Sequence, residues 1–160
     1  AVFGIHRYGE GRGGNRIFQN WVKYQLYIST ELGTYRYEPF SQKLAFVNKE
    51  TFSSIKGAPY AKNTFRIALV IPAEELKNAK KRFNAYMNAG VIYQKIFQIC
   101  VSQGWATRIH EAKPYEKELR KILKTGDKDA IMWVQSCGYP EAPHNPKSVV
   151  FPFFDFDYQD

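Results

Sequence analysis

The chain has 160 residues, 44% of them hydrophobic and 16% aromatic, and carries a formal net charge of +8. This length suits one domain with its own core over residues 1–160, and the composition is far from that of a disordered segment. No apolar run approaches the roughly 20 residues that a membrane span needs, so no membrane partner is expected. The basic surplus indicates an anionic partner such as a phosphate group, or a solvated basic surface.

The first half of the chain predicts an antiparallel meander. A glycine-rich loop at Gly9–Arg16 precedes a segment in which apolar and polar residues alternate, and two further segments of this kind follow after short turns. Asn48 is placed to cap a short helix over Lys49–Lys56. The expected strands are Val22–Thr30, Thr34–Glu38, Lys43–Val47 and, strongest and most central, Thr64–Ile71.

A long helix is expected from about Ala73, after Pro72 ends the central strand. Between Phe83 and Val101 apolar residues occupy nearly every helical face, which is typical of a helix in the middle of a domain or at a subunit interface. Gly104 fits the left-handed position that stops a helix. The following residues, Trp105–Ile109, are β-branched and aromatic and predict a strand.

The last third predicts one more helix and one more strand. Pro114 begins a helix that runs through Lys124, and Ala130–Ser136 reads as a buried strand. The segment Ser148–Phe154 is too apolar for a free end, so we expect it to add a strand or to cover another surface, including that of a partner subunit. Strands followed by alternating helices and strands define an α+β domain.

Three pieces of the sequence, in this order and spacing, resemble the nitroreductase-like flavoprotein superfamily, and most closely its azoline (SagB-type) dehydrogenase subgroup. A Gly-x-Tyr-x-Tyr-Glu-Pro hairpin follows an asparagine-containing loop, a buried helix contains a glutamine and ends at a glycine, and a Gly-Tyr-Pro turn precedes a basic residue. GIHR at Gly4–Arg7 is similar to a further upstream element. The three pieces are Asn20–Val47, Ala89–Thr107 and Val134–Lys147.

The resemblance implies an antiparallel-rich sheet with a buried central helix, an intimate homodimer, and FMN as cofactor. The buried helix and the apolar tail would form the subunit contact. The activity implied is hydride transfer through flavin N5 to or from a small organic substrate of nitro, quinone or azoline type, with NAD(P)H as one candidate electron donor.

The resemblance also implies a set of cofactor-binding residues. Cations would hold the flavin phosphate, the Asn20 amide would bind the pyrimidine edge of the ring or else cap the turn, and the segment Arg108–Ala112 would offer backbone N–H groups near flavin N5 and O4. His110 and Glu111 would form an acid–base pair or, more commonly for such a pair, a surface feature. The set is Arg7, Arg16, Asn20, Glu111, Ala112 and Lys147.

Two departures from the family pattern keep other functions open. The arginine-rich helix that opens the family is missing here or was removed, and Ile17 stands where the family's loop has a serine. A flavin-less binding or scaffold subunit is therefore the first alternative. A basic nucleic-acid-binding domain is a weaker one, because the basic residues are dispersed.

The histidines and cysteines add little to these alternatives. The three histidines show no metal-ligand spacing. Cys100 and Cys137 lie in apolar contexts and read as free buried thiols, which fits a reducing, cytoplasmic compartment.

Overall fold

The computed structural model describes residues 23–39, 41–59 and 65–139. Within these ranges it contains six strands, two α-helices and three short 3₁₀ helices. The strands are β1 Gln25–Thr30, β2 Gly33–Glu38, β3 Lys43–Asn48, β4 Phe65–Ile71, β5 Ala106–His110 and β6 Ala130–Gly138; the α-helices are α1 Ala79–Ser102 and α2 Glu116–Leu123; the 3₁₀ helices are η1 Phe52–Ser54, η2 Ala73–Leu76 and η3 Lys113–Tyr115.

The six strands form one antiparallel sheet in the order β3-β2-β1-β4-β6-β5. The predicted meander, β1 to β3, makes one half of it, and the two later strands pair on the other side of β4. Strand β4 is central as expected, and every side chain from Arg66 to Ile71 is buried. The sheet with helices on both faces confirms the predicted α+β class.

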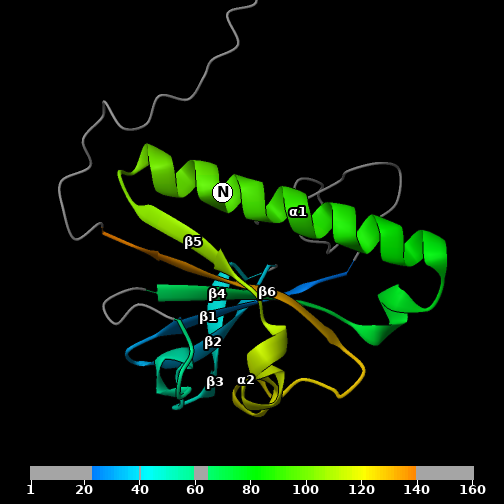
Figure 1. Ribbon diagram of the computed structural model, residues 1–160, viewed down its shortest axis with the longest axis horizontal. Coiled ribbons are helices and arrows are strands. Elements are labelled where there is room, and N and C mark those ends of the chain that lie inside the picture. Colours follow the sequence, from blue (N-terminus) through cyan, green and yellow to red (C-terminus); the bar gives the residue numbers. More distant parts are fainter. Residues whose placement is uncertain (1–22, 40, 60–64, 140–160) are drawn as a thin grey trace, which may run out of the picture.

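The sheet lies between two helical layers (Figure 1). Helix α1 crosses one face and packs on alternate residues of β1, β4 and β6, among them Leu26, Leu69 and Trp133. Helix α2 and η1 cover the other face, where Val70, Leu119 and Phe52 belong to a second core. The alternation of side chains along β4 supplies both cores, because successive residues of a strand point to opposite faces.

Both ends of α1 follow from local sequence. The Asn78 side chain accepts a hydrogen bond from the Lys81 backbone N–H at 2.9 Å, which caps the first turn. At the other end Gly104 has a φ of 71°. The N–H groups of Gly104 and Trp105 donate to the carbonyls of Val101 and Cys100, and this pair of bonds is the Schellman motif. Gly104 therefore stops the helix as the sequence predicts.

Two expected helical segments differ from the structure. Residues 49–56 form no α-helix: the Asn48 side-chain oxygen accepts from the Glu50 N–H, and only η1 follows. The helix after Pro72 begins at Ala79, because η2 and a bend come first. At Asn48 a side chain that bonds to nearby backbone competes with a helical start. Before α1, the Asn78 side chain caps the helix and so sets its start at Ala79.

Helix α1 buries one side and exposes the other. Its inner residues, such as Ala89 and Ile92, are fully buried against the sheet. An outer stripe of Phe83, Tyr86, Met87, Gly90 and Val101 faces away from the sheet, and Phe83 keeps 60% of its surface exposed. One sheet covers only one side of a helix. Within the described part of the chain, only one side of this apolar helix is therefore buried.

Candidate functional site

Strand β5 and the residues after it form the described part of the predicted cofactor site. No other described strand lies beyond β5, so its outer edge presents backbone N–H and C=O groups that the sheet does not pair. Arg108 and Ile109 are exposed on this edge strand, and Glu111 and Ala112 follow it directly. Arg108 lies within the strand, and the loop expected over Arg108–Ala112 is confined to its last two residues.

The two described site residues differ in their surroundings. Glu111 is exposed, whereas only 2% of Ala112 is exposed, because its methyl group packs in the core beneath α2. The Ala112 carbonyl accepts a hydrogen bond from the Tyr115 N–H at 3.0 Å, which begins η3. The groups that this turn can offer to a cofactor are therefore the backbone N–H and C=O groups of Glu111 and Ala112, rather than their side chains. Arg7, Arg16, Asn20 and Lys147 lie outside the described residues.

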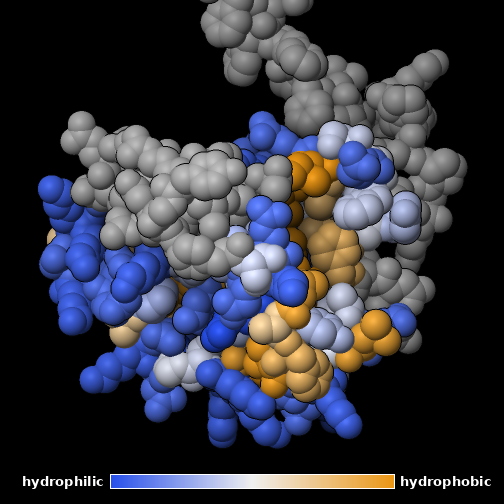
Figure 2. Space-filling view, turned by 180° about the vertical axis from the view of Figure 1, so that it is seen from behind, coloured by the Kyte–Doolittle hydropathy of each residue, from blue (hydrophilic) through white to orange (hydrophobic). Residues whose placement is uncertain are grey.

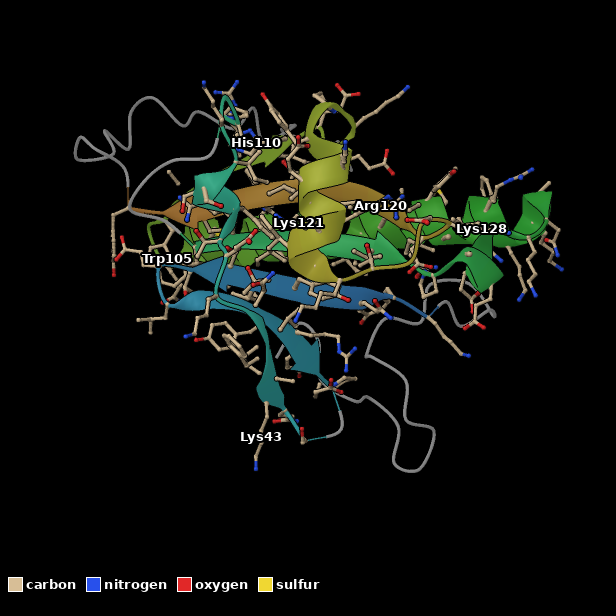
Figure 3. The ribbon with its side chains drawn as sticks, turned by 90° about the horizontal axis from the view of Figure 1, so that it is seen from below. Lys43, Trp105, His110, Arg120, Lys121 and Lys128 are labelled. Carbon is tan, nitrogen blue, oxygen red and sulfur yellow. The ribbon has the colours of Figure 1, made fainter. Side chains whose placement is uncertain are left out.

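His110 is a buried residue, so the expectation of a surface feature is wrong for His110, whereas Glu111 is exposed. The His110 ring nitrogen Nε2 lies 3.0 Å from the Ser136 hydroxyl on the neighbouring strand. Burial, followed by the positive charge of Arg108, lowers the pKa of His110 below its ordinary value of 6.5. A neutral imidazole thus ties the end of β5 to β6, just before the turn at Glu111. Figure 3 shows His110 near the start of α2.

Sequence reasoning did not identify the polar groups that share this face with His110. Arg66 pairs in register with Ser29 on one side and with Ser136 on the other, and Arg66 and Ser29 are completely buried. The Ser29 hydroxyl accepts a hydrogen bond from the Phe52 N–H at 2.9 Å. Burial lowers the pKa of Arg66, and Glu31 opposes this effect. The one sequence signal was an arginine inside an otherwise apolar strand.

A second polar network lies on the α1 side of the β5–β6 pair. The Gln135 amide donates to the Thr107 hydroxyl at 2.8 Å, and that hydroxyl donates to the Ser136 carbonyl at 3.0 Å. Cys137 is next to Thr107, and burial raises the pKa of its thiol to about 12. Cys100 and Cys137 are both free and buried, as the sequence predicts. These contacts fix β5 against β6 from both faces.

The fold is found in solved structures of nitroreductases. The chain superimposes with a TM-score of 0.69 and 17% identity on a putative nitroreductase from Ralstonia eutropha JMP134. A chain of the E. coli microcin synthetase McbBCD complex with truncated pro-MccB17 bound gives 0.71 and 16%. Each match covers 88% of this chain. A putative nitroreductase from Anabaena variabilis ATCC 29413 gives 0.60 and 16%, over 73% of this chain.

These likenesses show that the chain has the nitroreductase-like fold that its sequence predicts. The chain spans 69%, 60% and 27% of the lengths of the three matched chains, respectively. No protein-family model and no curated protein sequence matches it. Within the described ranges, no helix has both the length and the apolar character needed to cross a membrane.

Proposed function

We propose that the protein is an FMN-dependent oxidoreductase that acts on a small organic substrate. The observation that carries this proposal is the nitroreductase-like fold over 88% of the chain, with the predicted cofactor turn at the end of an open edge strand. Bound FMN would supply hydride transfer to or from that substrate. Nitro, quinone and azoline compounds remain the candidate substrates, and NAD(P)H a candidate donor.

The described residues fit such a cofactor through their backbone. In an antiparallel edge strand every second residue directs its N–H outward, so β5 offers donors to acceptor atoms such as flavin N5 and O4. The hydrogen bond between His110 and Ser136 and the one between Gln135 and Thr107 hold β5 in place. Donors fixed in advance lose no orientational freedom when they bind, which is the condition for useful electrostatic stabilisation.

The remaining roles belong to residues outside the described ranges. Arg7, Arg16 and Lys147 would hold the phosphate by charge-assisted hydrogen bonds, and Asn20 would bind the pyrimidine edge of the ring through its amide. Glu111 would contribute backbone only, since its carboxylate is exposed and would disfavour an anionic reduced ring nearby. The net charge of +8 suits an anionic cofactor.

Titration of the apo-protein with FMN tests the binding site. Arg7→Ala and Lys147→Ala should each remove a charge-assisted bond worth roughly 1.5–3 kcal/mol, which is about a 10- to 150-fold loss of affinity. Lys43→Ala is the matched control, because it removes the same charge from an exposed residue at the opposite edge of the sheet. Equal affinity in all three variants would place the phosphate elsewhere.

The Asn20→Asp variant separates a flavin contact from a turn cap. Asp caps about as well as Asn, so a purely structural role predicts unchanged stability and an unchanged flavin midpoint potential. A role at the ring edge predicts a lower midpoint, because the new carboxylate disfavours the anionic reduced flavin. Potentiometric titration gives the midpoint, and thermal unfolding gives the stability.

The same proposal includes a homodimer formed through the outer stripe of α1. Gly90 lies in this stripe, and a Cβ built on it meets no atom within 4 Å. A mid-helix glycine costs roughly 0.5–1 kcal/mol relative to alanine, and nothing in the described chain requires it. Close approach of a second copy's backbone would explain why this position has a glycine, since a side chain would then be in the way. Light scattering that shows a soluble monomer for the intact chain would contradict this interface.

The flavin-less alternative makes a different prediction. A binding or scaffold subunit with this fold would purify colourless and would fail to take up FMN at any practical concentration. Its support is Ile17 in place of the family's serine, together with the likeness to a chain of a multi-subunit complex. The visible absorption spectrum of the purified protein, before and after incubation with FMN, decides between the two.

A further inference from the structure

The half of the sheet that α1 leaves uncovered carries a hydrophobic surface separate from the outer stripe of α1. We call it the hairpin face: Tyr35, Tyr37, Leu44 and Phe46. Strands β2 and β3 pair Tyr35 with Phe46 and Tyr37 with Leu44, so all four side chains lie on the α1 side of the sheet. Leu44 is 48% and Phe46 57% exposed, and the rings of Tyr35 and Phe46 meet edge to face at 5.8 Å.

This face lies beside the α1-side core rather than far from it. Helix α1 packs on β5, β6 and η2, and the core beneath it extends to Leu26 of β1, with Tyr37 packed at its margin. Beyond that margin no described residue covers Leu44 and Phe46. Figure 2 shows hydrophobic surface among hydrophilic residues on the side of the molecule that is hidden in Figure 1. Contiguous apolar patches of this kind on soluble proteins mark a surface that something else covers.

A row of aromatic rings leads toward this face from the end of the described chain. Tyr139 follows β6 and contacts Trp105 edge to face at 6.1 Å, and Trp105 contacts Phe65 of β4 at 5.5 Å. Because the strands are antiparallel, the end of β6 lies at the same end of the sheet as the start of β2 and the end of β3. Tyr35 and Phe46 are therefore at the end of the sheet from which the chain continues.

We propose that the hairpin face is the docking surface of the segment Ser148–Phe154 of the same chain. Six of its seven residues are valine, phenylalanine or proline. The eight residues 140–147 span at most roughly 26 Å at about 3.3 Å per residue. The four strand spacings from β6 to β3 amount to about 19 Å. The segment thus reaches the face, and its side chains match the exposed Leu44 and Phe46 in character.

Cysteine cross-linking tests this contact directly. In the full chain, Phe46→Cys combined with Phe151→Cys should form an intrachain disulfide under mild oxidation, at a yield independent of protein concentration. Lys43→Cys with Phe151→Cys is the matched control, since Lys43 is exposed on the same strand but on the opposite face. A concentration-dependent cross-linked dimer would overturn the proposal, and so would a cross-link from Phe18→Cys in place of Phe151→Cys.

Thermal unfolding provides a second test without oxidation. Phe46→Ser and Phe151→Ser should each lower the melting temperature by roughly 2–6 °C, and the double variant should lose little more than one of them alone. Phe83→Ser, which removes an exposed ring from α1, should instead combine additively with Phe151→Ser. Additive losses for Phe46 and Phe151 would show that the two side chains do not meet, and would overturn the proposal.

Discussion

The two faces of the sheet differ in how completely their apolar side chains are covered. On the α2 side, η1 and α2 close a core in which even polar groups such as Ser29 and Arg66 are fully buried. On the α1 side, the helix covers β4 and β6 and leaves both its own outer stripe and the hairpin face exposed. On the α2 side the described residues bury their own apolar surface. On the α1 side apolar surface stays exposed, and other residues or another copy of the chain would have to cover it.

The largest expected effect comes from truncating matched phenylalanines on the two sides. Phe52 has no exposed surface on the α2 side, and Phe83 is 60% exposed on α1. Phe52→Ala should cost about 3–5 kcal/mol of unfolding free energy, because it removes a ring and leaves a cavity. Phe83→Ala should cost less than about 1 kcal/mol in a monomer and act on self-association instead. Urea unfolding at low protein concentration measures both; equal losses would contradict the comparison.

The next effect concerns His110, whose burial makes the α2 side sensitive to acid. Its folded-state pKa lies below the ordinary value of 6.5, so below about pH 6.5 the unfolded chain binds a proton that the folded chain resists. The contribution of His110 to stability should therefore be constant above pH 7, and stability should fall as the pH drops through and below 6.5. His110→Gln should flatten this dependence between pH 7 and 5. A wild-type melting temperature that rises on acidification would contradict the assignment.

Much of the fold was predictable, since all six described strands and the stop at Gly104 depend on local patterns. The hydrophobic alternation around Tyr27 and the glycine after Gln103 are readable without tertiary contacts. The burial of Arg66 and of His110 was not predictable, because it depends on which strands become neighbours: Ser136 lies 26 residues from His110. Likewise, the all-round apolar pattern of α1 does not tell which side faces the sheet.

A smaller effect is expected at Gly90, on the exposed outer side of α1. Gly90→Ala should stabilise a monomeric chain by about 0.5–1 kcal/mol, because alanine loses less backbone entropy and the structure has room for its Cβ. The same methyl group should weaken a dimer in which another backbone approaches Gly90. Comparing unfolding at low and high protein concentration separates the two. A gain in stability at both concentrations would show that the Gly90 side of α1 does not form the dimer interface.

The last prediction is that the two cysteines of the folded protein are not alkylated. Cys100 lies on the inner side of α1 and Cys137 lies beneath this helix, and both thiols are buried. Burial raises the pKa of Cys137 to about 12, so Cys137 forms almost no thiolate at neutral pH. Both thiols should resist iodoacetamide at pH 8 in the folded protein and react fully in denaturant. Because the inner face of α1 is closed even though its outer face is open, Phe83→Ser should leave this protection intact. Rapid labelling of the native protein, detected by mass spectrometry, would show that α1 opens as a unit and that the α1 side is loosely held as well as incompletely covered.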